Sequence, residues 1–278
     1  MVVTVEPLGP RNVDALKALL GRDTLHNLYL LGIVEEFGVV CDPARFPFAF
    51  HGRFEGGELT AVLFVGGSGG LVIPSASPLG AIVDIAKAIH GSVTMRAAMG
   101  EKALVDSLVQ QFSATVKFSK VQRLFGVSAD DLGPFTNPML RLATEHDLPQ
   151  LVPLAAACVT ELFNRDPMAE DPEGFPMRVR QRVRTKRTYV LEENGTLIVK
   201  LDVGSRSQFG AELEGLYTLP ASRQQGHATL CMGQISRFLL SSLPRLSVRV
   251  DDSNAALERV VRKVGYMPGR AQRMVTEG

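Results

Sequence analysis

The chain has 278 residues, of which 45% are hydrophobic, 21% charged and 6% aromatic. At roughly 150 residues per domain, this length favours two domains. The apolar content excludes a mainly disordered chain. Lys and Arg number 30 against 29 Asp and Glu, which excludes a protein that holds nucleic acid through a general basic excess.

Cysteine spacing and the N-terminal residues bear on the cellular compartment. The three cysteines, Cys41, Cys158 and Cys231, are far apart and odd in number, which predicts reduced thiols and neither a disulfide framework nor a zinc site. The N-terminal residues lack the basic and apolar segments of a signal peptide. The longest apolar stretch, 151–159, is about half as long as a membrane span. We therefore expect a cytoplasmic protein with no membrane partner.

The N-terminal segment 5–19 is similar to segment 140–154. In both, a short strand and a turn precede apolar residues at the spacing of an amphipathic helix. The alignment places Asn12 on Asp147, and Thr144 with Asp147 resembles a capping box in which Asp replaces the usual Glu. Both segments are therefore predicted to begin a helix with one buried face.

A second pair of similar segments follows, 54–66 and 192–204. Each contains two apolar runs separated by Gly-Gly or Asn-Gly, residues that accept the positive φ angles of a tight hairpin turn. Two matches in the same order, at nearly the same spacing, indicate duplication. The turn-rich segment 133–138 then separates two predicted domains, 1–136 and 137–278.

Each half is predicted to contain the same succession of elements. The order is strand, helix or helices, hairpin, strand, helix, strand, helix. Such a succession produces a mixed, mostly antiparallel sheet flanked by helices, in the α+β or α/β class.

The segment 212–228 contains a strand, a turn and the start of a helix. Residues 212–219 have strand character, and apolar residues recur at helical spacing after Gly226. The connection carries Arg223, Gly226 and Ala228 in an R-x-x-G-x-A pattern. The unpaired N–H groups and positive dipole end of a helix start suit a phosphate or diphosphate. Gly226 lets the backbone approach this anion, and Arg223 adds a fixed positive charge at the rim.

Residues 137–278 resemble the GNAT N-acetyltransferase family. The family's acetyl-CoA motif, Q/R-x-x-G-x-G/A, follows a strand often written V-x-P, and here Thr218-Leu219-Pro220 stands for that strand end. A second family motif is a strand and an asparagine-capped helix that ends in Gly-Phe. It resembles residues 246–266, with Asn254 at the helix start. The tandem arrangement is similar to two-domain members with a degenerate first domain.

The resemblance implies acetyl-CoA as the co-substrate. Backbone groups from Leu216 to Thr218 would hold the pantetheine arm, and Asn254 would contact the cofactor near its pantetheine end. The diphosphate would be held by backbone amides of the loop and first helical turn, which belong to Gln224, Gln225, Gly226, His227, Ala228 and Thr229.

Proton transfer is where the sequence departs from the family. Many members carry a tyrosine seven residues after the asparagine, which protonates the departing thiolate, and here that position is Val261. Tyr217 or Tyr266 could replace it. Glu214 is the candidate base, because a carboxylate on the cofactor strand can take the proton that the attacking amine must lose. Two-residue alternation predicts that Glu214 shares a strand face with Thr218. A solvated strand-end carboxylate is the alternative.

The first half keeps less of the loop pattern. Aligning Pro74 with Pro220 places Gly80 at the loop glycine. The loop arginine is then replaced by Ser77, and Ile82 brings a β-branched side chain to the place where the anion would approach. We therefore expect a decayed copy that binds CoA poorly, stabilises the second half and shapes the acceptor cleft.

Three further patterns have less specific interpretations. Ser68 in GGSGG matches the G-x-S-x-G nucleophile elbow, but the next residues continue as a strand, which favours a hairpin loop. The basic run 178–187 is either a solvated helix face or a collar for an acidic acceptor or the 3′-phosphate of CoA. The five histidines lack metal-binding spacing, so no metal site is predicted, and His227 is expected to act through its backbone N–H.

The sequence thus predicts a tandem N-acetyltransferase, monomeric or homodimeric, that transfers acetyl from acetyl-CoA to a primary amine by direct attack. The acceptor could be a small molecule, an amino acid or a protein amine, and it could be acidic. The alternative is a catalytically weak or inactive acyl-CoA-binding protein, which Val261 favours. A hydrolase that uses Ser68 is a third hypothesis.

Overall fold

The computed structural model describes residues 2–40, 47–66 and 70–277. Contacts divide the chain into two compact units. Unit 1 comprises Met1–Leu124, Arg249–Asn254 and Pro268–Gly278, and unit 2 comprises Phe125–Val248 and Ala255–Met267. The C-terminal strand is thus grouped with the first half of the chain, whereas the predicted domains 1–136 and 137–278 are consecutive; that boundary stays a prediction.

Apart from one short extra helix in the second half, the two halves of the chain contain the same elements in the same order. The first half forms β1 (Val3–Pro7), α1 (Val13–Gly21), α2 (Thr24–Phe37), β2 (Phe48–Glu55), β3 (Glu58–Gly66), β4 (Leu71–Ala76), α3 (Gly80–Ile89), β5 (Ala97–Glu101), α4 (Lys102–Gln111) and β6 (Val116–Val127). The second half forms β7 (Arg141–Leu142), α5 (Leu148–Phe163), the short α6 (Pro167–Glu170), α7 (Gly174–Arg184), β8 (Thr188–Glu193), β9 (Thr196–Ser207), β10 (Gly210–Thr218), α8 (His227–Leu240), β11 (Leu246–Asp251), α9 (Ala255–Val264) and β12 (Met267–Glu277). The α+β class is confirmed, and so is the predicted succession of elements, to which each half adds a final strand, β6 or β12.

The starts of α1 and α5 share one capping arrangement. The backbone N–H of Gly9 donates to Asn12 Oδ1 at 2.9 Å, and the backbone N–H of Thr144 donates to Asp147 Oδ2 at 2.7 Å. In each case a short 3-10 turn leads into the helix. The predicted capping box at Thr144 is confirmed, and its counterpart at Asn12 supports duplication of this segment.

The β2–β3 and β8–β9 hairpins are also alike in detail. The turn residues Gly56-Gly57 have φ angles of 59° and 87°, and Asn194-Gly195 have 49° and 77°. Such pairs of positive φ angles form the tight turn that the sequence predicts. Each ladder also shifts register, between residues 53 and 54 of β2 and between residues 191 and 192 of β8. These are equivalent positions in the two aligned segments, so the irregularity is duplicated with the hairpin.

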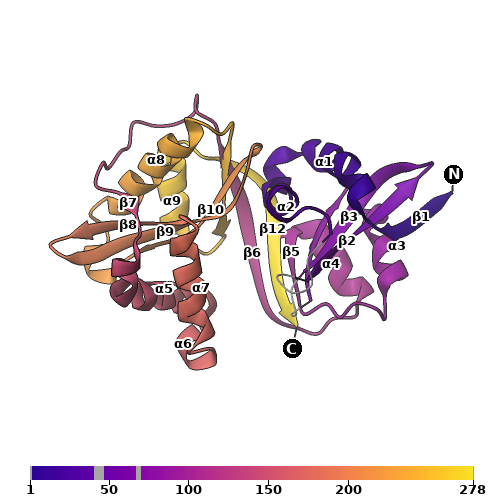
Figure 1. Cartoon of the computed structure of the whole chain (residues 1–278), viewed down its shortest axis with the longest axis horizontal. Helices are drawn as coiled ribbons and strands as arrows, with labels where there is room; N and C mark the ends of the chain where they lie inside the picture. Colours follow the sequence, from indigo (N-terminus) through magenta and orange to yellow (C-terminus); the bar gives the residue numbers. More distant parts are fainter. Residues whose placement is uncertain (1, 41–46, 67–69, 278) are drawn as a thin grey trace. The chain divides into compact units, whose positions relative to one another are not determined.

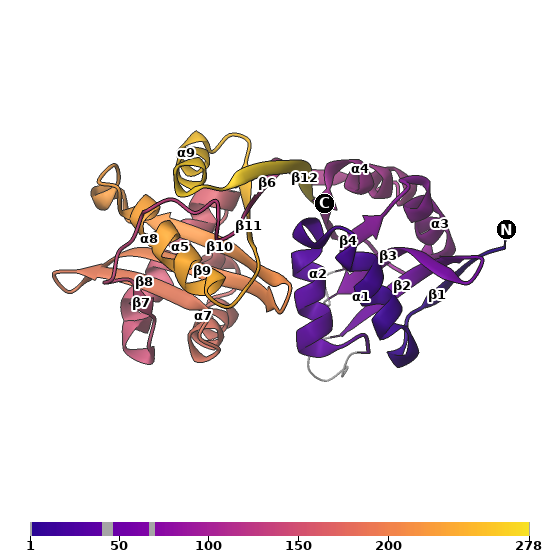
Figure 2. The same ribbon diagram turned by 90° about the horizontal axis from the view of Figure 1, so that it is seen from above.

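In unit 1 the strand order is β1-β2-β3-β4-β5-β12-β6. β4 and β5 are parallel and pair at Leu71–Ala97 and Val72–Ala98, and β12 runs antiparallel to β5. α1 and α2 cover one face of this sheet, and α3 and α4 cover the other (Figures 1 and 2).

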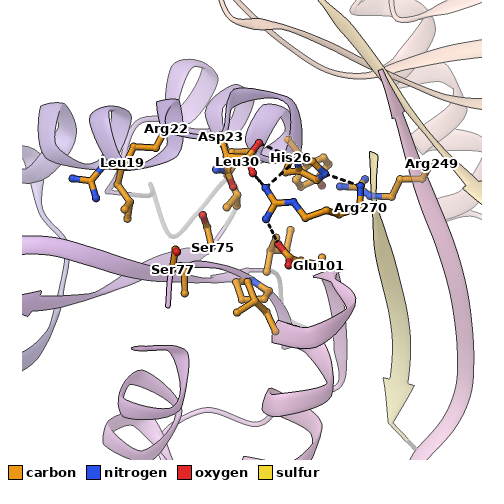
Figure 3. Close-up of a pocket in the computed structure, with 17 residues that line it drawn as sticks. Leu19, Arg22, Asp23, His26, Leu30, Ser75, Ser77, Glu101, Arg249 and Arg270 are labelled. Carbon is orange, nitrogen blue, oxygen red and sulfur yellow. Dashed lines mark hydrogen bonds and ion pairs between the residues drawn. The ribbon is translucent and has the colours of Figure 1, made fainter. Parts of the chain in front are cut away.

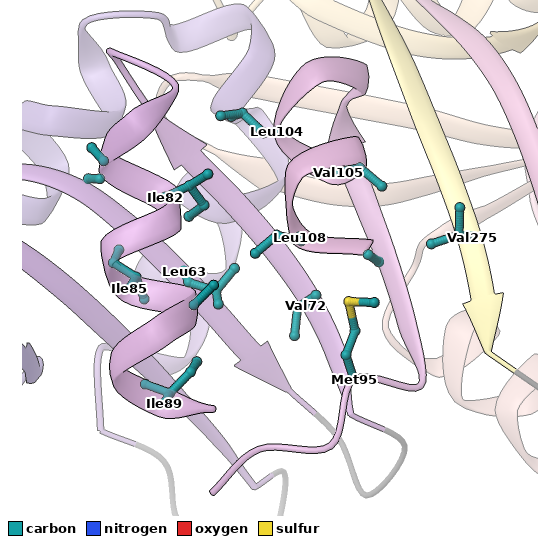
Figure 4. Close-up of a cluster of buried hydrophobic side chains, with 14 residues drawn as sticks. Leu63, Val72, Ile82, Ile85, Ile89, Met95, Leu104, Val105, Leu108 and Val275 are labelled. Carbon is teal, nitrogen blue, oxygen red and sulfur yellow. The ribbon is translucent and has the colours of Figure 1, made fainter. Parts of the chain in front are cut away.

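A cavity lies on one side of the unit 1 sheet, and a packed apolar cluster lies on the other. Near α1, α2 and the carboxyl ends of β4 and β5 lies a cavity of about 330 Å³ (Figure 3). Apolar side chains of α3 and α4 instead pack against the sheet (Figure 4). This buried cluster includes Leu63, Val72, Ile82, Ile85, Leu108 and Val275. Each large side chain buried in this way contributes about 1.5–3 kcal/mol to folding.

In unit 2 the strand order is β11-β10-β9-β8-β7. β10 is parallel to β11 and antiparallel to β9. α5 and α7 lie on one face of this sheet and α8 and α9 on the other (Figures 1 and 2). None of the helices in the described residues is long and apolar enough to cross a membrane.

Candidate functional site

The connection from β10 to α8 is the centre of the predicted site. Gln224 and Gly226 have φ angles of 62° and 87°, so the chain turns sharply before α8 begins at His227. Apart from atoms of neighbouring residues in the chain, no described heavy atom lies within 4 Å of a Cβ built on Gly226. The amide of Leu230 donates to Gly226 O at 3.1 Å, and the amides that precede it in α8 are those that a helix cannot satisfy internally. This helix start can therefore hold an anion.

The Arg223 side chain contacts other residues of unit 2. Its Nε donates to Thr218 O at 3.0 Å, its Nη2 donates to Glu161 Oε2 at 2.6 Å, and its guanidinium lies 5.2 Å from the centre of the Tyr217 ring. The hydrogen bond that Arg223 donates to Glu161 raises the pKa of Arg223. Arg223 therefore fixes the end of β10 on α5, and its charge is matched by a neighbouring carboxylate.

The other loop side chains make few strong contacts. His227 Nδ1 lies 3.6 Å from Glu193 Oε1, and His227 Nε2 lies 3.4 Å from Gln225 Oε1. Gln225 Nε2 donates weakly to Ala221 O at 3.4 Å. The His227 ring is thus directed to β8, which is compatible with the predicted role of its backbone N–H.

β10 is irregular just before this loop. Its pairing with β9 shifts register between Glu212 and Leu213 and again between Glu214 and Tyr217, and Gly215 has a φ of 59°. The parallel ladder to β11 in the described residues ends at Leu213–Val248. The backbone groups of the last residues of β10 are therefore not committed to a regular parallel ladder with β11.

This irregularity changes the predicted direction of Glu214. Its Oε1 lies 2.6 Å from Arg182 Nη1 on α7, and Tyr217 packs in the cluster formed by α5 and α7. Glu214 and Tyr217 therefore lie on the same face although they are three positions apart, because the bulge adds a residue to β10. The prediction by strict alternation that Glu214 shares a face with Thr218 is wrong.

A buried polar cluster that the sequence analysis missed lies beneath the bulge. Lys200 Nζ donates to Asp202 Oδ2 at 2.5 Å, and Thr188 Oγ1 donates to Asp202 Oδ1 at 2.6 Å. Arg182 Nη1 is 3.5 Å from the same carboxylate. Burial opposes the charge on Lys200, but Asp202 raises the pKa of Lys200 overall. The sequence contained one signal for this cluster: two opposite charges, Lys200 and Asp202, lie within the apolar run of β9.

The candidate proton donors differ in access to solvent. Tyr217 is 8% exposed, and its pKa is raised by burial and by Glu161, against the effect of Arg223. Tyr266 is buried, its hydroxyl lies 2.8 Å from Ser236 Oγ, and burial raises its pKa. Val261 is also fully buried. Tyr266 is therefore a structural residue of the core, and Tyr217 stays the candidate proton donor.

Asn254 belongs by its contacts to unit 1. Its backbone N–H donates to Asp251 O at 2.8 Å, and α9 begins at the next residue. The predicted position at a helix start is confirmed, and its contact with the cofactor stays a prediction.

The basic run is largely paired with acidic residues of unit 2. The pairs are Arg178–Asp171, Arg180–Glu145, Arg184–Glu145 and Arg182–Glu214. Most of these side chains are about half exposed, so the pairs are of the solvated kind that adds little stability. They favour the interpretation of 178–187 as a solvated helix face.

The equivalent connection in unit 1 is much shorter. Only residues 77–79 separate β4 from α3, whereas residues 219–226 separate β10 from α8. Pro74 lies inside β4, so it is not equivalent to Pro220. Ile82 is fully buried in the core, so the prediction that it obstructs an anion is wrong. The physical difference between the two units is therefore the length of this connection.

Ser68 and Cys41 lie outside the described residues. Cys158 and Cys231 are free and buried, and burial raises the pKa of Cys231 to about 12. No cluster of three or more His, Cys, Asp or Glu side chains suited to a metal ion occurs in the part of the chain that the structure describes.

Residues 149–266 match the family model described as Acetyltransferase (GNAT) family. This part of the chain therefore belongs to the GNAT superfamily, which confirms the resemblance seen in the sequence. The comparison with curated proteins finds no match.

Solved structures show the same fold over nearly the whole chain. A tandem GNAT protein from the clavulanic acid biosynthesis pathway is 11% identical, with a TM-score of 0.59 over 99% of this chain and 98% of that chain. A Drosophila protein is 16% identical, with a TM-score of 0.69 over 98% of both chains. A GNAT acetyltransferase from Colwellia psychrerythraea is 12% identical, with a TM-score of 0.58 over 99% and 100%. At sequence identities this low, the similarity shows that these proteins share a fold.

Proposed function

We propose that unit 2 binds acetyl-CoA at the connection between β10 and α8 and transfers the acetyl group to an amine. Gly226 carries this proposal, because its positive φ turns the chain into α8 and the space beside it is open. A helix start with bare amides suits a diphosphate. Membership of residues 149–266 in the GNAT family indicates the class of acyl donor.

Residues of the loop, of β10 and of the start of α9 would divide the binding of acetyl-CoA between them. The amides from Gln224 to Thr229 would hold the diphosphate, and backbone groups from Leu216 to Thr218 would bind the pantetheine arm. Asn254 would contact the pantetheine end. Arg223, which is paired with Glu161, would position the loop.

The reaction would be a direct attack of a neutral amine nitrogen on the thioester carbon. The C–N bond forms and the C–S bond breaks, so the amine must lose a proton and the departing sulfur must gain one. Glu214, directly or through water, would take the first proton, and the Tyr217 hydroxyl would supply the second. Backbone N–H groups of irregular β10 would stabilise the carbonyl oxygen as it gains charge. The acceptor would be a small-molecule, amino-acid or protein amine.

An acyl-CoA-binding protein without turnover is the second candidate. Val261, at the family's tyrosine position, is fully buried, and Glu214 is ion-paired. CoA release over a panel of amines separates the two candidates. An amine that raises release above background supports the transferase, and binding without amine-dependent release supports the second candidate.

Calorimetric titration of acetyl-CoA tests the binding site. Gly226→Glu places a bulky anion at the helix start and should weaken binding at least a hundredfold. Gly195→Glu is the matched control, because Gly195 also has a positive φ of 77° and an open surrounding in the same unit. It strains a hairpin turn but should leave affinity unchanged. Equal affinity of Gly226→Glu and the wild type would refute the site.

A further inference from the structure

The cavity of about 330 Å³ in unit 1 shares no lining residue with the β10–α8 loop described above. The 17 residues that line it all belong to unit 1. They come from α1, α2 and the residues between them, from the ends of β4 and β5 and the residue after β4, and from Leu104 of α4, Arg249 and Arg270 (Figure 3). The inference drawn from it therefore does not depend on acetyl transfer by unit 2.

The strands create this cavity by diverging. β4 and β5 pair in parallel at Leu71–Ala97 and Val72–Ala98, and the cavity is lined by later residues of both, Ile73 to Ser77 and Gly100 to Glu101. The carboxyl ends of neighbouring parallel strands are a common place for ligands. The cavity is near the lower end of the roughly 300–1,000 Å³ typical of ligand sites.

The acidic groups of the cavity are already engaged by a cation. Arg270 Nη1 lies 2.7 Å from Glu101 Oε2, and the other end of the same guanidinium is ion-paired with Asp23. Asp23 Oδ1 is also 2.8 Å from His26 Nδ1. A cationic ligand would therefore have to compete with Arg270 for both carboxylates.

His26 does not add a further positive charge. Its Nε2 accepts a hydrogen bond from the backbone N–H of Arg270 at 3.2 Å, which places the ring proton on Nδ1, toward Asp23. Burial lowers the pKa of His26, and Arg249 acts in the same direction against Glu101. The ring is therefore neutral near pH 7.

The remaining charges favour an anion. Arg22 and Arg249 line the cavity in addition to Arg270, so three cations face two carboxylates. Arg22 is paired with Glu58 at 2.6 Å, and both side chains are mostly exposed, so this pair is easily exchanged for another anion. A ligand with one carboxylate group can take the place of Glu58 on Arg22, which keeps the charges around the cavity balanced.

The other walls supply hydroxyl groups and apolar surface. Ser75 of β4 and Ser77, which follows β4, point into the cavity (Figure 3). Leu19, Leu30 and Ile73 provide aliphatic contacts. The connection 77–79 is too short to form a diphosphate loop like that of residues 219–226. We propose that unit 1 binds a small aliphatic monocarboxylate, without a nucleotide part, in this cavity.

Ligand-observed NMR titrations of the full chain test this proposal with sodium butyrate and sodium hexanoate. Butyramide and hexanamide have nearly the same shape without the charge, and they should bind at least tenfold more weakly. Ser75→Leu fills the cavity and Arg249→Gln removes a lining cation, and each should weaken carboxylate binding at least tenfold. Arg11→Gln is the matched control, because Arg11 is an exposed, ion-paired arginine of unit 1 outside the cavity.

The outcomes separate this site from the acetyl-CoA site. Gly226→Glu should leave carboxylate binding unchanged, whatever it does to acetyl-CoA. Equal binding of the amides would overturn the ligand class, and undiminished binding by Ser75→Leu would place the ligand elsewhere. Failure of both carboxylates to bind a wild-type chain that is folded by circular dichroism would reject the site.

Discussion

Arg182 Nη1 lies 2.6 Å from Glu214 Oε1 and thereby ties the candidate base on β10 to α7. The same nitrogen is 3.5 Å from Asp202, so Glu214 is linked to the buried cluster under the bulge. The Glu214 side chain is 35% exposed, which leaves it accessible to an amine. Arg182 is therefore a positioning residue for Glu214.

Replacing Glu214 tests its role as the base. Glu214→Gln should lower kcat for acetyl transfer by about 10²–10⁴, the usual contribution of a general base, and change KM for acetyl-CoA little. Arg182→Gln should lower kcat less, and Arg182→Lys should restore part of the loss. Glu173→Gln, at the exposed start of α7, is the control. Unchanged kcat in Glu214→Gln would leave Glu214 as an ion-pair partner only.

Tyr217 and Tyr266 form a matched pair for the proton donor. Tyr217→Phe should lower kcat at least tenfold with little loss of stability, because its hydroxyl would protonate the departing thiolate. Tyr266→Phe should keep kcat but lose about 1 kcal/mol of stability, because its buried hydroxyl bonds to Ser236. Steady-state kinetics and urea denaturation of both variants measure these effects. A fall in kcat confined to Tyr266→Phe would contradict the assignment.

Local chemistry explains what the sequence could predict. The Asn194-Gly195 turn and the Thr144–Asp147 cap depend on residues next to each other in the chain, so their residue types suffice. The start of α8 near Gly226 was predictable for the same reason.

Long-range pairing explains what the sequence could not predict. The bulge in β10 depends on its register against β9, and it alone puts Glu214 and Tyr217 on one face. The pairing of Arg182 with Glu214 depends on where α7 packs. The short length of the connection 77–79 could not be seen in the sequence, because aligning Pro74 with Pro220 takes no account of where β4 and β10 end.

The bulge at Gly215 should tolerate no side chain. Its φ is 59°, and a Cβ there would lie 2.8 Å from Asp202 Oδ2 and 2.9 Å from Lys200 Nζ. Gly215→Ala should therefore lose about 2–4 kcal/mol, from the left-handed backbone and from displacement of the buried pair. Gly195→Ala, with a similar φ but open space, should lose only about 1–2 kcal/mol. Equal midpoints of urea denaturation in the two variants would show that Lys200 and Asp202 can move aside without a loss of stability.

The cap at α5 should depend on pH, and the equivalent cap at α1 should not. Two hydrogen bonds of 2.8 Å from Arg141 hold the pKa of Asp147 at about 2, with help from Thr144 and against burial. Because the folded pKa is depressed, this stabilisation is complete above about pH 4 and is lost as the pH falls toward 2.

Asp147→Asn isolates that charge, since an amide oxygen can still accept the backbone N–H of Thr144, as Asn12 accepts that of Gly9. It should cost about 1–2 kcal/mol at pH 7, and the cost should shrink as the pH falls from 4 to 3. Asn12→Ala should cost about 1 kcal/mol at both pH values, because its partners carry no titrating charge. Urea denaturation at pH 7 and pH 3 makes the comparison. A cost of Asp147→Asn that stays constant between them would mean that the ion pair with Arg141 contributes nothing to folding.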